Sequence, residues 1–357
     1  WSWTQEELAL LPGLTLLEFI ERLPGFVTVL PGGFGRPVGL TAVGLGGAAV
    51  RVRIDGYTLD PHDSFAYPLE SISLADISRV TVERSLGEVV VDVETYRLEQ
   101  DEPHSMIQVG TGVFQTRLLR AIFSRGFGTR SVGTGSFDML RTGGIGIDEV
   151  YRHSSASFRW SFVPTERAGI EIDWRRTAID RGGTVFPLQT SRSDLVVRGR
   201  AGLGERGTLE AYLGKSDAEE DLGDRDVTLL GALQAGARAA FAGERLGLEG
   251  GVIVRSDREG PAVPAPGFEA EGSVVLQPFR AVRVWAGGRF ESGEGETAGS
   301  YHATATLSPF AGLALFAAYD GGSRLYSAAF TVPGEGEQPP TTEFGTGWAE
   351  ISGVRAG

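Results

Sequence analysis

The chain has 357 residues, a net charge of −13 and no cysteine. Its acidic balance argues against a nucleic-acid partner, because phosphate contacts need concentrated Lys and Arg, and Lys215 is the only lysine. The lack of cysteine excludes disulfide scaffolds, thiolate metal sites and cysteine nucleophiles. Glycine, with 52 residues, has about twice its usual share. That excess disfavours long helices and favours many turns and closely approaching strands.

The first hundred residues predict a mixed α+β domain. Two short helices are expected at 6–11 and 15–23, the second with Leu16, Phe19, Ile20 and Leu23 on one face. Thr15 and Glu18 form a candidate capping box for it, and Pro24-Gly25 follows as a stop signal. A third short helix is expected at 73–78. Short strands are expected at 27–30, 49–54, 80–84 and 89–96.

After about residue 104, apolar and polar residues alternate with a period of two. Ile170, Ile172 and Trp174 alternate with Glu171, Asp173 and Arg175, and three further runs share the pattern, starting at Phe158, Phe268 and Tyr301. Each run has about 9–12 residues, the length of strand that crosses a bilayer at a tilt. No segment approaches the ~20 consecutive apolar residues of a membrane helix; the best, 8–17, is interrupted by Pro12 and Gly13.

The expected connections also alternate in length. Tight turns are expected at 164–168, 204–207, 243–247, 278–281 and 309–312, and longer polar loops at 179–193, 216–226, 256–267 and 291–299, with one shorter loop at 320–323. Short turns on one side and long loops on the other are typical of an outer-membrane barrel, here of about 14–16 strands. A soluble β-sandwich or barrel is the alternative, since it alternates in the same way.

Several motifs are better explained by structure than by chemistry. The "GLGERG" at 202–207 has dinucleotide-binding spacing but strands are expected on both sides, which predicts a hairpin turn. The four histidines (His62, His104, His153 and His302) lack ligand spacing, although His62 precedes Asp63 and Ser64. Asp55-Gly56 predicts a turn. The acidic run 217–226 lacks the ligand order of an EF-hand, leaving a solvated loop or weak divalent binding.

Arginines within the expected strands indicate which face lies inside a barrel. Arg200, Arg238, Arg283 and Arg289 are expected to point to the lumen, because Arg on the lipid face costs ~2–4 kcal/mol at the midplane. Trp285 shares the face of Arg283 and Arg289, so it is expected inside too. His302 alternates with Thr304 and Thr306 and is expected to face the lumen as a polar wall residue.

Three segments of the N-terminal region resemble the plug domain of TonB-dependent outer-membrane receptors. They are "LLEFIERLPGFVTV" (16–29), "VRVRIDGYTLDP" (50–61) and "YPLESISLADISRVTVERS" (67–85), in the family's order and at suitable spacing. The sequence departs from the family at "TAVGLGGAAV" (41–50) and at "SLGEVVVDVETYR" (85–97), and no TonB box is recognisable before Trp1. The resemblance implies a barrel of 22 strands and a terminal aromatic, whereas this chain is shorter and ends in "ISGVRAG". It is therefore either cut short at the C-terminus or a reduced relative.

The sequence thus predicts a mainly β protein, with a transmembrane antiparallel β-barrel and a small N-terminal α+β plug domain. The expected domains are 1–100, plug-like, and 104–357, the barrel, which is incomplete if the C-terminus is cut short. The resemblance implies a receptor of the bacterial outer membrane that binds or imports a small ligand, with membrane lipid and a TonB-type energising protein as partners.

The alternative is a non-transporting scaffold subunit of the cell envelope, built on a degenerate plug-barrel. An outer-membrane hydrolase is a poorer hypothesis, because no Ser-His constellation stands out. No catalytic, cofactor-binding or metal-binding residue is expected, no enzymatic activity is expected, and the ligand-binding residues stay open.

Overall fold

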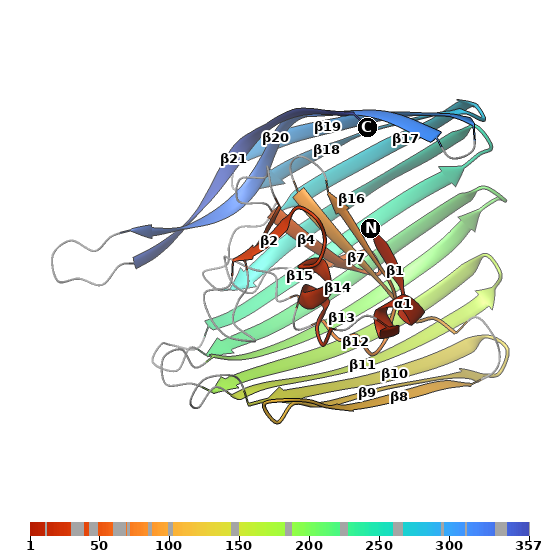
Figure 1. The fold of residues 1–357 in the computed structure, drawn as a ribbon. Coiled ribbons are helices and arrows are strands. Elements are labelled where there is room, and N and C mark those ends of the chain that lie inside the picture. The colour runs from red at the N-terminus through yellow and green to blue at the C-terminus, as the bar shows by residue number, and fades with distance from the viewer. Residues whose placement is uncertain are drawn as a thin grey trace.

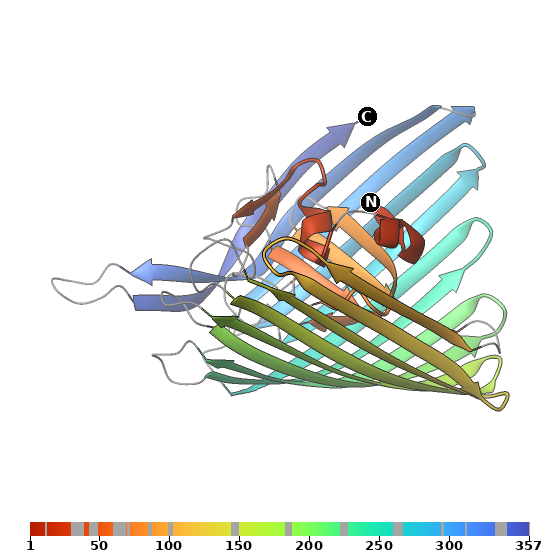
Figure 2. The same ribbon diagram turned by 60° about the horizontal axis from the view of Figure 1, so that its bottom comes forward.

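The structure is a computed structural model of the whole chain. It describes residues 1–10, 13–29, 39–42, 49–59, 69, 72–84, 88–98, 103–143, 150–182, 188–221, 228–259, 267–293, 296–310, 313–332 and 341–356. Within these residues the chain forms a small N-terminal domain and a long curved β-sheet, here called the barrel wall, that bends around it (Figures 1 and 2).

The N-terminal domain is built on a five-stranded sheet with the order β1-β6-β7-β4-β5. β4 and β7 pair in parallel and the other neighbours are antiparallel. A separate hairpin joins β2 and β3. The elements are β1 (Ser2–Thr4), α1 (Gln5–Leu10), α2 (Leu16–Ile20), β2 (Phe26–Val29), β3 (Gly39–Ala42), β4 (Ala49–Ile54), β5 (Tyr57–Leu59), β6 (Ile77–Arg84) and β7 (Glu88–Thr95).

A dry core holds this domain together. The predicted face of the second helix is buried as expected, with Leu16 and Ile20 fully inaccessible, and it packs against the alternating valines of β4, β6 and β7. Thr15 caps α2, since its side chain accepts a hydrogen bond from the Glu18 amide. The capping box is only half formed, because the Glu18 carboxylate accepts from the Leu14 amide instead of that of Thr15.

The predicted helix at 73–78 is wrong. Ser73 Oγ and the Leu74 amide both bond to the carboxylate of Asp138 in the wall, and the Ala75 amide bonds to Ser73 Oγ. These bonds replace the helical ones, and β6 begins at Ile77.

The barrel wall is one antiparallel sheet of fourteen described strands, which pair in chain order from β8 to β21 and within the predicted number. Among the described residues no pairing joins β8 to β21. The strands are β8 (His104–Thr111), β9 (Arg117–Phe127), β10 (Ser131–Thr142), β11 (Val150–Thr165), β12 (Ala168–Gly182), β13 (Leu188–Leu203), β14 (Gly207–Asp221), β15 (Thr228–Ala242), β16 (Leu246–Glu259), β17 (Phe268–Phe279), β18 (Val282–Gly293), β19 (Glu296–Phe310), β20 (Leu313–Val332) and β21 (Thr341–Ala356).

The predicted alternation is confirmed, with apolar side chains on the outer face and polar ones inside. Ile170, Ile172 and Trp174 are 36–50% exposed, whereas Asp173 between them is 2% exposed. Ile172 lies opposite Val197, which lies opposite Leu213, so the outer apolar residues form continuous rows across the strands. A sandwich would bury these rows against a second sheet. No second sheet covers them among the described residues, so the alternative of a sandwich is wrong.

The turns fit the prediction better than the loops do. Tight turns lie at four of the five predicted places, including the hairpin of the "GLGERG" motif, where Gly204 has φ +72°. The fifth, at 309–312, includes residues 311–312, which lie outside the described residues. The long loops are shorter than predicted: β12 runs to Gly182 and β14 runs to Asp221, so the first half of the acidic run lies in a strand and 222–227 fall outside the described residues. The prediction assigns these polar residues to loops, but a strand ladder can continue past its apolar belt.

The predicted loop at 320–323 is also wrong, because these residues lie inside β20, the 20-residue strand that with β21 projects beyond its neighbours in Figure 1. A Cβ on Gly321 would lie 2.7 Å from the Tyr301 hydroxyl. The glycine pair therefore makes room for a cross-strand neighbour rather than a turn.

No helix among the described residues is long and apolar enough to cross a membrane.

Candidate functional site

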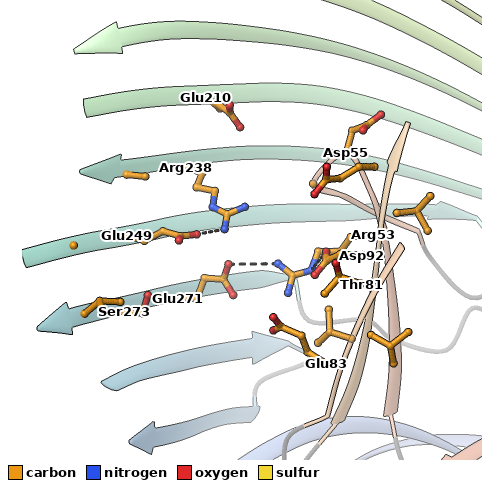
Figure 3. Close-up of a pocket in the computed structure, with 18 of the residues that line it drawn as sticks. Arg53, Asp55, Thr81, Glu83, Asp92, Glu210, Arg238, Glu249, Glu271 and Ser273 are labelled. Atoms are coloured by element: carbon orange, nitrogen blue, oxygen red, sulfur yellow. Dashed lines mark ion pairs between the residues drawn. The ribbon is translucent and has the colours of Figure 1, made fainter. Parts of the chain in front are cut away.

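A polar cavity of 2510 Å³ separates the N-terminal domain from one side of the barrel wall. The domain contributes side chains from β4, β6 and β7, and the wall contributes side chains from β14 to β20. Figure 3 shows residues of the domain facing those of β14 to β17. This position follows from the alternation of the wall strands, which turns every second side chain inward.

Acidic residues outnumber basic ones on the cavity lining by nine to five. The acids are Glu6, Asp55, Glu83, Asp92, Glu94, Glu210, Glu249, Glu271 and Asp320, and the bases are Arg53, Arg97, Arg238, Arg283 and Arg289. The lining therefore carries a formal charge of about −4, which opposes the entry of anions.

Arg53 joins the two sides of the cavity. Its guanidinium lies 3.3 Å from Asp92 in the neighbouring β7 and 3.7 Å from Glu271 of β17 in the wall (Figure 3). Arg289 of β18 also pairs with Glu271, at 3.1 Å, and on the wall Arg238 pairs with Glu249. Burial raises the pKa of Asp92, and nearby Glu83 adds to this, while Arg53 opposes it.

A second cluster anchors the domain to the opposite part of the wall. Asp55 forms the two-residue β4–β5 turn with Gly56, both at positive φ, as an Asp-Gly turn requires. Its carboxylate accepts bonds from the amide and the hydroxyl of Thr95 at 2.9 and 2.6 Å, and from Arg159 of β11 at 2.9 Å. Arg159 also lies 3.4 Å from Asp173 of β12.

The Asp55 carboxylate is almost completely buried, yet it stays ionised. Burial would raise its pKa, but the guanidinium groups of Arg159, Arg175, Arg198 and Arg97 outweigh burial and hold the pKa well below the usual range. A buried carboxylate among several cations is expensive to separate from them, so this cluster fixes the domain against the wall.

A third cluster adjoins the pairs of Arg53, since Arg289 also lies 3.0 Å from Glu269. Arg51 of β4 donates to Glu269 of β17 at 2.6 Å and to Glu291 of β18 at 3.2 Å, and both carboxylates are buried. Strand β4 and the turn that follows it are thus tied to the wall at β11 and again at β17 and β18. Further bonds join Ser157 to Asp76 at 2.9 Å and Arg120 to the Leu14 carbonyl.

The residues that the sequence indicated for the lumen do line the cavity. Arg238, Arg283, Trp285, Arg289 and His302 are on its wall, whereas Arg200 pairs with Glu210 at 3.5 Å near the strand end. The other described histidines do not form a cluster with His302. The ring of His104 stacks on Tyr96 with centroids 4.5 Å apart, and His153 is buried in β11. His62 lies outside the described residues, together with Asp63 and Ser64.

Sequence reasoning did not find the anchoring role of Asp55, which was predicted only as a turn. Its partner Arg159 is 104 residues away and carries no motif. The signal that could have found the pair is the alternation itself, because Arg159 and Asp173 occupy inward positions of neighbouring strands and face each other in register.

No group of three or more potential metal ligands is found in the part of the chain that the structure describes. The arrangement offers hydrogen bonds, charges and aromatic faces along a wide channel. Those features suit binding of a polar solute.

Comparisons with known proteins agree with this architecture. Residues 1–92 match the TonB-dependent Receptor Plug Domain family. Among curated proteins no significant match is found. The siderophore receptor PirA from Acinetobacter baumannii superposes with a TM-score of 0.73 at 12% identity, over 97% of this chain and 67% of that one.

Two further solved structures have the same fold. The copper transporter OprC has a TM-score of 0.73 at 12% identity, over 90% of this chain and 62% of that one. The FrpB iron transporter from Neisseria meningitidis has a TM-score of 0.69 at 11% identity, over 92% and 64%. The chain thus spans roughly two thirds of the length of these structures, and at such identities the likeness establishes the fold alone.

Proposed function

We propose that this chain, which carries the plug domain of TonB-dependent receptors within the barrel fold of those receptors, is a bacterial outer-membrane receptor for a small polar ligand. The ligand enters the lumen and passes along the cavity between the N-terminal domain and strands β14–β20. The domain blocks free diffusion. The chain takes no catalytic part.

One observation carries the proposal: the N-terminal domain is tied by buried ion pairs to the wall on two sides, and a polar cavity remains beside it. A domain held in this way acts as a plug, because its removal would break the bonds of Asp55 and Arg51 together. Spontaneous opening is therefore rare, and an energising partner of the TonB type supplies the work.

The outer face supports the location. Its rows of exposed Phe, Ile, Leu and Val would be unfavourable in water but fit the hydrocarbon of a bilayer. Side chains such as Phe158, Val197 and Leu213 are 41–59% exposed on this face. Lipid is the partner that would cover them.

The proposal has a two-part test on the natural full-length polypeptide. Fractionation of membranes is expected to place it in the outer membrane, with heat-modifiable migration on a gel. The purified protein is then expected to bind the C-terminal domain of a TonB-type protein from the same organism, and to bind it more tightly with ligand present. A water-soluble protein would contradict the location, and absence of TonB binding would contradict the energised mechanism.

A further inference from the structure

Trp285 is an aromatic side chain that faces a polar lumen. It lies on β18 between Arg283 and Gly287 on the inward face, and 37% of it is exposed to the cavity. Other aromatic side chains of the wall either point outward, as Trp174 does at 38% exposure, or pack inward against the domain, as Tyr151 and Tyr212 do. Trp285 instead leaves part of its ring open to the cavity, where a ligand can contact it.

The ring of His302 supports Trp285 from one side. The two ring centroids lie 3.7 Å apart with a 30° tilt, across the β18–β19 pairing. Gly287 makes this possible, because a Cβ there would lie 2.6 Å from the His302 ring. The indole is therefore held in place before any ligand arrives, with another surface open to the cavity.

Trp285 lies opposite the apolar Val275 on β17, and its other cross-strand neighbours on the cavity are uncharged hydroxyl groups, with one free cation nearby among the described residues. Thr304 lies directly opposite it on β19, and Thr306 lies opposite Arg283. On the other side Ser273 lies opposite Gly287. Among the described residues Arg283 has no ion pair, although it lines the same cavity.

Charge narrows the class of ligand. The excess of acids on the cavity lining opposes anions on their way in, and the unpaired Arg283 opposes cations at the indole itself. A neutral solute meets neither penalty. The hydroxyls of Thr304 and Thr306 and the guanidinium of Arg283 offer hydrogen bonds at the edge of an apolar face.

We propose that Trp285, backed by His302, is a binding platform for a neutral sugar ring. The apolar C–H face of a pyranose lies on the indole, and its hydroxyls bond to Arg283, Thr304 and Thr306. The inference deepens the proposed function, since it rests on the lumen being the path of the ligand and names the class of ligand.

The test is equilibrium binding to the purified chain, which needs neither a membrane nor an energising partner. The protein is labelled with 5-fluorotryptophan and kept in a detergent without a sugar headgroup. Methyl β-glucopyranoside and maltotriose are titrated while ¹⁹F spectra are recorded. The Trp285→Phe variant assigns the resonance, and Trp174→Phe assigns a control indole of equal exposure on the outer face.

The expected result is a saturable shift of the Trp285 resonance with either sugar and no shift of the Trp174 resonance. Trp285→Phe is expected to weaken maltotriose binding, followed by calorimetry, by about tenfold, and Arg283→Gln by a smaller factor. Benzoate and benzylammonium, an anion and a cation with flat rings, are expected to shift the resonance less than the sugars.

Three results would overturn the inference: no saturable shift with either sugar, equal shifts of the two indoles, or a stronger response to a charged ring than to maltotriose. The proposed function fails separately, through location or TonB binding. Sugar binding by a protein found outside the outer membrane would keep the platform and reject the receptor.

Discussion

The N-terminal domain and the barrel wall use the same strand geometry with opposite insides. In the domain, the side chains of β4, β6 and β7 that point inward are valines and isoleucines that are almost inaccessible. In the wall, most inward side chains are Asp, Glu, Arg, Ser and Thr, apart from Trp285 and a buried cluster at Leu118, Leu140, Tyr151 and Ile179, while most apolar ones point out. The difference teaches that period-two alternation identifies a strand but does not say which face is dry; the surrounding solvent decides that.

The largest effect is expected where the two regions meet. Arg159→Ala should lower the free energy of unfolding by about 3–5 kcal/mol, because buried Asp55 and Asp173 lose one of their two shared cations and keep only Arg175 in common. Denaturant titration in detergent measures this. Arg152→Ala is the control on the same strand, since its pair with Asp180 is about half exposed and should contribute less than ~1 kcal/mol. Equal losses from the two variants would contradict the anchoring role.

The next largest effect on stability is expected in the buried apolar core of the N-terminal domain. Leu16→Ala, at a fully buried position of α2, should cost about 2–5 kcal/mol through lost contacts and a cavity. Leu10→Ala, at an 86% exposed position of α1, should change stability by less than ~0.5 kcal/mol. Protease resistance of the domain at increasing denaturant concentration measures the stability change of both variants. If Leu16→Ala leaves the stability unchanged, the domain does not have a tightly packed core.

The outer face of the wall predicts an effect that depends on depth. Leu213→Arg, in the middle of β14, should destabilise by about 2–4 kcal/mol in lipid, whereas Leu209→Arg, near the turn on the same face, should cost only ~0–1 kcal/mol. Folding into vesicles under a urea gradient compares them. If the two substitutions cost the same, the face does not cross a bilayer.

The smallest effects on stability are expected at two carboxylates of the N-terminal domain, and they should have opposite signs. The pKa of Asp55 is lowered, so its contribution to stability is present above its ordinary value of 3.8 and is lost as the pH falls further. The pKa of Asp92 is raised, so its charge costs stability as the pH rises through that value. At pH 7, Asp55→Asn should lower the melting temperature and Asp92→Asn should raise it slightly. Shifts of the same sign would be inconsistent with these environments.

Local sequence signals predicted most of the fold. The strand at 49–54 has the predicted bounds, and the alternation at 170–175 fixed which side chains point inward. The helix at 73–78 failed because Asp138, more than sixty residues away, bonds to Ser73 and the Leu74 amide. No local pattern carries that information.

The candidate site was predictable only in part, because local patterns place single side chains but not contacts between distant segments. Arg238 and Arg283 were assigned to the lumen because Arg is costly on a lipid face, and Trp285 because it shares the face of Arg283, but Glu249 and Glu271 were not singled out. Their inward positions could have been read from the strands. The contacts of Arg53 could not, because they depend on how the N-terminal domain sits against the wall.

The central claim is that the wall has a lipid-facing side and a side turned to the N-terminal domain. Because the chain has no cysteine, single cysteines carrying spin labels can be placed at 170–175 without other changes. In vesicles, labels at 170, 172 and 174 should be accessible to oxygen, and labels at 171, 173 and 175 should be protected from it. Equal accessibility along the segment would contradict the claim.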